Sequence, residues 1–222
     1  SGNGNHGTVN GATLGTDRHG VNGKAYSFDG VDDKITVNDN ESLDLGNQAD
    51  GALTLTLWHN IRSTNYVGTS QGFLLGKFSR DGSPWTDYSI LANNNGLTWG
   101  TGPSTAAGGD AEAWMYKEYS FGIGKWNLLT VTFDAFSEKK KVFANGKLIN
   151  EVSTSVKNAA NNSPLTIGAE YNRGYWNGSI DDIRIYDRAL SAEEISLLYR
   201  AESPNHFVDS AKDLEMIWVE PG

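Results

Sequence analysis

The chain has 222 residues with seven Trp, nine Tyr and eight Phe, no cysteine, and a formal net charge of −9. This length can bury the core of one domain, and the absence of cysteine excludes a disulfide scaffold and thiol catalysis. The acidic balance, with residues 139–141 as the only basic run, argues against a nucleic-acid partner. No apolar run approaches the ~20 residues that a membrane-spanning helix needs.

Short alternating runs separated by Gly, Asn and Asp predict an all-β sandwich rather than alternating strands and helices. After a loop-like start at residues 1–7, the runs at 53–58 and 126–133 each alternate apolar residues with polar ones. A period of two places one face of each predicted strand inward. These two runs are therefore expected to be core strands.

A hairpin is predicted over residues 140–149, because Asn145-Gly146 tolerates positive φ at both turn positions. Residues 164–168 and 178–186 give two further strands, joined by a polar loop over 169–177 that is a candidate functional surface. One helix is expected after Ser191, which with Glu194 forms a capping box. It should pack against the edge of the sandwich and end near residue 203, where Pro204 begins a linker.

The order of several motifs resembles the LamG-like, concanavalin A-like jelly-roll domains over roughly residues 1–200. The motifs are Gly-Asn-Gly-Asn-His-Gly at 2–7, Phe-Asp-Gly-Val-Asp-Asp at 28–33, Leu-Thr-Leu-Trp at 55–58, Gly-Lys-Trp at 124–126, Phe-Ala-Asn-Gly at 143–146, Leu-Thr-Ile-Gly at 165–168 and Asp-Asp-Ile-Arg-Ile-Tyr-Asp-Arg-Ala-Leu at 181–190. The resemblance implies a jelly-roll sandwich of two antiparallel sheets with one short C-terminal helix. It also implies a recognition module of a secreted, periplasmic or cell-surface protein, and an earlier apolar strand before the Gly-Asn-Gly-Asn turn.

Domain boundaries follow from the same resemblance. Residues 1–203 are expected to form the jelly roll, and 204–222 a linker with the stub of a following domain. Residues 207–222, which include Met-Ile-Trp-Val and Pro-Gly, resemble the opening of a formylglycine-generating-enzyme-type, or sulfatase-modifying, domain. The alternative is a plain final strand that completes the sandwich. On the first interpretation this chain is part of a larger multidomain protein.

The acidic residues around two predicted strands form a candidate calcium site. Calcium takes six to eight oxygen ligands from carboxylates and backbone carbonyls. In similar domains a structural calcium is often held here, which implies Asp29, Gly30 and Asp182 as ligands, with Asp32 in reserve. The alternative is that Asp-Gly is ordinary turn chemistry and that Asp182 pairs with Arg184.

Aromatic residues in Gly- and Asn-rich stretches form a candidate glycan site, because a flat ring can stack on the apolar face of a sugar. The alternative for each ring is burial in the core. Arg173 and the amides of residues 93–95 would be polar partners for sugar hydroxyls. The predicted ligand-binding residues are Trp85, Tyr88, Trp99, Trp114, Arg173 and Trp176.

No catalytic residues are predicted. Retaining glucanases on this kind of sandwich need two carboxylates about 5–5.5 Å apart. Their Glu-x-Asp-x-x-Glu pattern is missing, Asp110 and Glu112 coming nearest, and the four histidines form no metal-binding motif. The favoured function is carbohydrate binding by a non-catalytic domain. A protein-recognition or spacer domain is the alternative, and a glycoside hydrolase is third.

Overall fold

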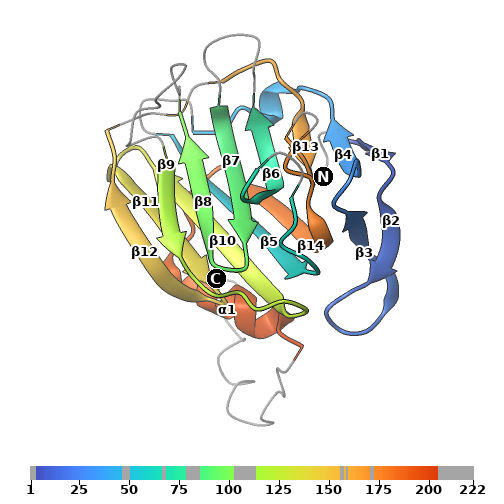
Figure 1. Cartoon of the computed structure of the whole chain (residues 1–222). Coiled ribbons are helices and arrows are strands. Elements are labelled where there is room, and N and C mark those ends of the chain that lie inside the picture. The colour runs from blue at the N-terminus through green and yellow to red at the C-terminus, as the bar shows by residue number, and fades with distance from the viewer. Residues whose placement is uncertain are drawn as a thin grey trace, which may run out of the picture.

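Alternating apolar and polar residues build two β-sheets in the computed structural model, which describes residues 4–46, 51–66, 69–78, 86–102, 114–155, 158, 160–170 and 173–204. Each sheet has seven strands within these ranges, and every strand pair is antiparallel (Figure 1). The all-β jelly-roll prediction is confirmed. No helix in the described ranges is long and apolar enough to cross a membrane.

The first of the two sheets is called sheet A. In spatial order it consists of β1 (Gly7–Asn10), β4 (Lys34–Val37), β13 (Leu165–Ile167), β6 (Gly72–Phe78), β7 (Thr86–Asn93), β8 (Gly96–Thr101) and β9 (Trp114–Glu118). The short 3₁₀ helix η1 (Glu41–Leu43) follows β4 along the chain. β1 and β9 therefore lie at opposite edges of the sheet.

The second sheet, sheet B, contains the longest strands. In spatial order it consists of β12 (Lys147–Ser153), β11 (Lys139–Ala144), β10 (Trp126–Asp134), β5 (Ala52–Ile61), β14 (Asn177–Tyr186), β3 (Asn22–Asp29) and β2 (Thr13–Thr16). The two predicted core runs fall in β5 and β10, which pair along their whole length. One face of each strand lies in the core as expected, but the alternate threonines are buried as well, so both faces of these two strands are covered.

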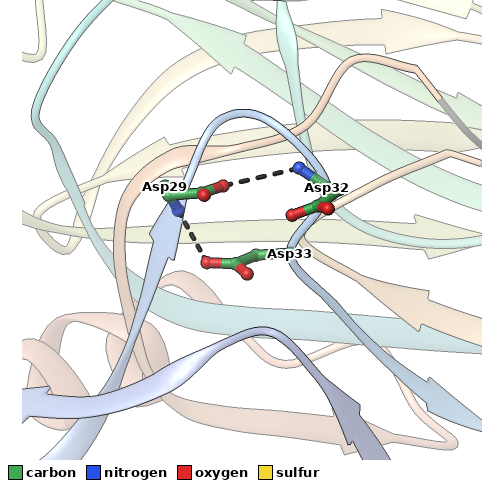
Figure 2. Close-up of side chains that lie close together, drawn as sticks. All are labelled: Asp29, Asp32 and Asp33. Carbon is green, nitrogen blue, oxygen red and sulfur yellow. Dashed lines mark hydrogen bonds between the residues drawn. The ribbon is translucent and has the colours of Figure 1, made fainter.

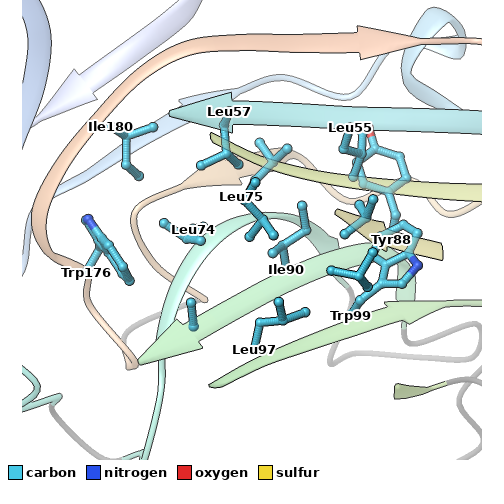
Figure 3. Close-up of a cluster of buried hydrophobic side chains, with 14 of the residues drawn as sticks. Leu55, Leu57, Leu74, Leu75, Tyr88, Ile90, Leu97, Trp99, Trp176 and Ile180 are labelled. Carbon is cyan, nitrogen blue, oxygen red and sulfur yellow. The ribbon is translucent and has the colours of Figure 1, made fainter. Parts of the chain in front are cut away.

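Side chains from the two sheets interdigitate in one main core (Figure 3). Leu55 and Leu57 from β5 meet Leu75, Ile90 and Leu97 from sheet A, and none of these five has measurable exposure. Burying each such side chain contributes roughly 1.5–3 kcal/mol. The sandwich thus holds together without cross-links, as the composition predicts.

The one α-helix of the described ranges, α1 (Ala192–Glu202), begins with the predicted capping box at Ser191 and Glu194. It lies across one end of sheet B (Figure 1) and contacts β12, the edge strand. It also covers strands further in, because the Tyr199 ring stacks on Trp58 of β5 at 5.9 Å between centroids. The expected packing at the edge is therefore only part of the contact.

Candidate functional site

Three of the aromatic residues predicted to bind a ligand are buried, which corrects the expectation of exposed rings at these positions. Tyr88, Trp99 and Trp176 have no measurable exposure and belong to the core (Figure 3). Tyr88 donates a hydrogen bond from its hydroxyl to the Leu43 carbonyl oxygen at 3.1 Å. The alternative of core packing holds for these three rings.

Strand register explains the burial. β7 and β8 pair so that Ile90 lies opposite Trp99 and Ala92 opposite Leu97. Alternate residues of a strand face the same side, so Tyr88 and Trp99 point inward together with these apolar neighbours. The Gly and Asn residues that made this stretch resemble a loop form only the turn between β7 and β8.

Trp114 lies on the outer side of sheet A, in the edge strand β9. Met115 is buried and Tyr116 is 55% exposed, so Trp114 and Tyr116 share the outer face. Each ring leans over a glycine of the neighbouring strand. A methyl group on Gly100 would lie 2.6 Å from the Trp114 ring, and one on Gly96 would lie 2.7 Å from the Tyr116 hydroxyl.

The glycines let both rings lie across β8 instead of standing away from the sheet. Trp114 is half-buried and Tyr116 is exposed, and together they form a patch of aromatic surface. Sequence reasoning missed Tyr116, although the alternation of residues 114–118 carried the signal. We call Trp114 and Tyr116, with Asn95, Glu118 and Ser120, the aromatic face.

A hollow of about 590 Å³ adjoins the Tyr116 ring, and its lining supplies the polar part of the aromatic face. Asn95, Glu118 and Ser120 are exposed there. Of the three predicted amides, Asn93 is already used locally, because its side-chain nitrogen donates to the Ser70 carbonyl at 3.0 Å. The arrangement combines a ring with amide, carboxylate and hydroxyl groups.

Arg173 is not part of the aromatic face. Its guanidinium donates to both carboxylate oxygens of Glu170, at 3.0 and 3.3 Å, so it holds its own turn together. Its loop follows β13, four strand positions from β9, or about 19 Å at normal strand spacing. Trp85, and the nearest carboxylates to a glucanase pattern, Asp110 and Glu112, lie outside the described residues.

The acidic turn after β3 brings three carboxylates together (Figure 2). Oxygen atoms of Asp29, Asp32 and Asp33 lie within 4.8 Å of one another. The Asp29 amide donates to Asp33 at 2.8 Å, and the Asp29 carboxylate accepts from the amides of Val31 at 2.8 Å and Asp32 at 3.4 Å. Burial, followed by the nearby charges of Asp29 and Asp32, raises the pKa of Asp33.

Asp182 does not join this group, which corrects the predicted ligand set. β14 pairs with β3 so that Asn177 lies opposite Asp29, leaving Asp182 five residues further along, roughly 16 Å at the usual rise. Asp182 instead pairs with the Arg18 guanidinium at 2.7 Å, and Arg184 lies 4.0 Å away. A bulge with Asp182 at φ 45° directs it to Arg18.

The remaining acidic turn fits the oxygen chemistry of calcium in part. Asp29, Asp32 and Asp33 offer carboxylate oxygens at mutual distances that one cation can bridge. Gly30 lies in the same turn at φ 85°, where a side chain would collide with Asn177. With one oxygen from each carboxylate, the turn supplies three of six to eight ligands, so backbone or water oxygens would have to complete the shell.

The chain belongs to the Laminin_G_3 family of the concanavalin A-like lectin/glucanases superfamily, whose model matches residues 29–196. This defines the class of protein that the two sheets and their topology indicate. No curated protein sequence is significantly similar to this chain.

Several solved structures share the fold. The binding domain of Paraclostridial Mosquitocidal Protein 1 aligns with a TM-score of 0.65 at 19% identity, over 90% of this chain and 48% of that one. The botulinum neurotoxin serotype G binding domain gives 0.64 at 17%, over 88% and 46%. The receptor binding domain of botulinum neurotoxin D gives 0.63 at 16%, over 89% and 48%. The chain spans about half the length of these neighbours.

Proposed function

We propose that this domain is a non-catalytic carbohydrate-binding module of a larger secreted or cell-surface protein, and that the aromatic face is its binding site. The observation that supports the proposal most is the pair of rings laid over Gly100 and Gly96 on an open sheet face. The similar folds of domains that are named for binding are consistent with a recognition role.

The chemistry of the aromatic face suits a sugar. The Trp114 and Tyr116 rings offer apolar area for the C–H face of a pyranose, and such contacts lose little side-chain entropy because the rings are already held. Asn95 can donate and accept, Glu118 can accept and Ser120 can do both, which covers the hydroxyls at the rim of the ring. A protein ligand could pack on the same rings, but it would not require amide, carboxylate and hydroxyl groups beside them.

We further propose that calcium, when bound, is held by Asp29, Asp32 and Asp33 and acts structurally. The two positive charges of the cation would offset most of the negative charge of three carboxylates that lie in one tight turn. The turn joins β3 of sheet B to β4 of sheet A, so fixing it would stiffen one edge of the sandwich. The aromatic face lies at the opposite edge of sheet A, which argues against a direct contact between calcium and ligand.

A glycan-array screen of the purified chain in calcium buffer tests the binding proposal, with Trp114→Ala and Tyr116→Ala run beside it. Phe136→Ala is the matched control, because Phe136 is 85% exposed and lies between β10 and β11 in sheet B. We expect a defined glycan to bind, with at least tenfold loss in both site variants and none in the control.

Two other outcomes would contradict the proposal. Equal binding by all four proteins would place the glycan site elsewhere. Silence across a broad array would favour the protein-recognition or spacer alternative, provided that circular dichroism shows the chain to be folded.

A further inference from the structure

Three side chains of the edge strand β9 form a line on the outer face of sheet A, because alternate residues of a strand share a face. They are Trp114, which is half-buried, and Tyr116 and Glu118, which are exposed. Neighbours in the line are about 7 Å apart along the strand, so the line covers about 14 Å. A ligand that lies along β9 therefore meets two aromatic rings and then a negative charge.

The Tyr116 ring and the Glu118 carboxylate belong to the same spot on the sheet, because a glycine lies between them. Glu118 is the residue opposite Gly96 in the pairing of β8 with β9. A methyl group on Gly96 would lie 2.7 Å from the Tyr116 hydroxyl oxygen and 2.9 Å from a carbon of its ring. The ring thus leans over the glycine that faces Glu118. One ligand group at this spot can contact both side chains.

The charge of this spot is negative. Among the residues that line the hollow beside Tyr116, all of which the structure describes, Glu118 alone carries a formal charge. Lys117, the preceding residue, points to the other side of the strand. Other carboxylates are neutralised within the fold, as Glu170 is by Arg173 at 3.0 Å. In the described part of the chain the Glu118 carboxylate has neither an ion pair nor a hydrogen bond, so it is available to a ligand.

The rings favour a ligand of the opposite charge as well. The face of a Trp or Tyr ring attracts an ammonium group that lies within about 6 Å of the ring centre. The formal net charge of −9 adds a longer-range attraction for cations. Carboxylate, rings and net charge therefore all select a cationic ligand over a neutral or an anionic one.

We propose that the aromatic face selects an amino sugar whose amine is free and protonated, within a linear oligosaccharide that lies along β9. This inference rests on the proposed carbohydrate function and names the ligand class of the same site. A pyranose ring stacks on Trp114 or Tyr116, and its ammonium group donates charge-assisted hydrogen bonds to Glu118. Asn95 and Ser120 bind hydroxyl groups of the same sugar. An acidic sugar would be repelled by Glu118.

Isothermal titration calorimetry with three oligosaccharides of equal length and linkage tests the proposal. They are built from glucosamine, N-acetylglucosamine and glucose, and they are compared at a mildly acidic pH that protonates the free amine. We expect the glucosamine form to bind at least tenfold more tightly than the other two in low salt, because hydrogen bonds between charged groups are the stronger ones. The preference should shrink in high salt.

Glu118→Gln locates the source of the preference, because glutamine keeps the shape of the side chain and removes its charge. This variant should bind the three oligosaccharides about equally. Glu193→Gln is the matched control, since Glu193 is exposed in α1, outside sheet A, and its substitution changes the net charge by the same amount. The control should keep the full preference for the glucosamine form.

Equal binding of the three oligosaccharides by the parent chain, or an unchanged preference in Glu118→Gln, would overturn the amino-sugar assignment and leave the carbohydrate site standing. Tighter binding of choline or of a lysine peptide than of the glucosamine form would overturn it too, because the ammonium group would then belong to another class of ligand. Undiminished sugar binding by Trp114→Ala and Tyr116→Ala, or no sugar binding by the parent chain, would contradict the proposed function and this inference together.

Discussion

At the scale of single residues, the buried imidazole of His59 makes the stability of the core depend on pH. His59 is fully buried between Phe121 and Trp176, with ring centroids 4.8 and 5.6 Å away, and neither ring nitrogen has a hydrogen-bond partner among the residues that the structure describes. Burial lowers the pKa of His59 from 6.5 to about 3. The folded state therefore holds a neutral ring where the unfolded chain would take up a proton.

Stability should fall as the pH drops below about 6.5, because the unfolded state then binds the extra proton. The loss from His59 is about 1.4 kcal/mol per pH unit down to the folded pKa. His59→Leu removes the group that takes up this proton. The free energy of unfolding of the variant in urea should therefore depend less on pH between 6.5 and 4.5. Parallel pH profiles for the two proteins would contradict the assignment.

The acidic turn gives a second prediction at the residue scale. Millimolar calcium chloride should raise the melting temperature, by about 5–10 °C at a hundredfold excess over the dissociation constant. Asp32→Asn should abolish most of the shift, while Asp182→Asn should keep it because Asp182 pairs with Arg18. Differential scanning calorimetry checks both. No calcium-dependent shift in the parent chain would rule out the proposed site.

At the element scale, the turn of the hairpin between β11 and β12 packs against α1. Asn145 and Gly146 have φ of 51° and 75°, as the sequence predicts for a two-residue turn. A methyl group on Gly146 would lie 2.9 Å from Cβ of Tyr199 in α1, whereas one on Gly124, at φ 74°, would have no atom of the described part of the chain within 4 Å. Alanine substitutions at these two glycines therefore distinguish the cost of backbone strain from the cost of steric contact.

Gly124→Ala should cost about 1–2 kcal/mol, from backbone strain alone. Gly146→Ala should cost a further 1–3 kcal/mol, approximately, because the helix must shift to make room. Urea unfolding of the two variants measures the difference. Equal costs would mean that α1 does not press on this turn.

The elements with strong local signals were predictable from the sequence. The Asn145-Gly146 turn, the Ser191 capping box and the alternation in β5 each require only a few neighbouring residues. β7 and β8 were harder, because Gly and Asn at their shared turn obscured the alternation around Trp99. Alternation places Tyr88 and Trp99 on the same side as their apolar neighbours, but that this side is buried depends on the packing of the two sheets, which no local pattern fixes.

At the scale of the whole molecule, the ordered motifs predicted the jelly roll, whereas the candidate site needed the structure. Trp114 was proposed from its type, but the glycines that seat its ring come from another strand. Asp182 was placed with Asp29 by resemblance, but the pairing of β14 with β3 puts it five residues along the strand from the residue opposite Asp29. Both outcomes depend on long-range pairing that single residues do not encode.

The proposed carbohydrate site is the outer face of β8 and β9. Amide chemical-shift mapping of the ¹⁵N-labelled chain, with soluble oligosaccharides added one at a time, tests it most directly. We expect a binding sugar to shift amides around Asn95, Gly100, Trp114 and Tyr116 and to leave the acidic turn and β14 unchanged. Shifts confined to the acidic turn, or no shifts with any sugar, would rule out this site.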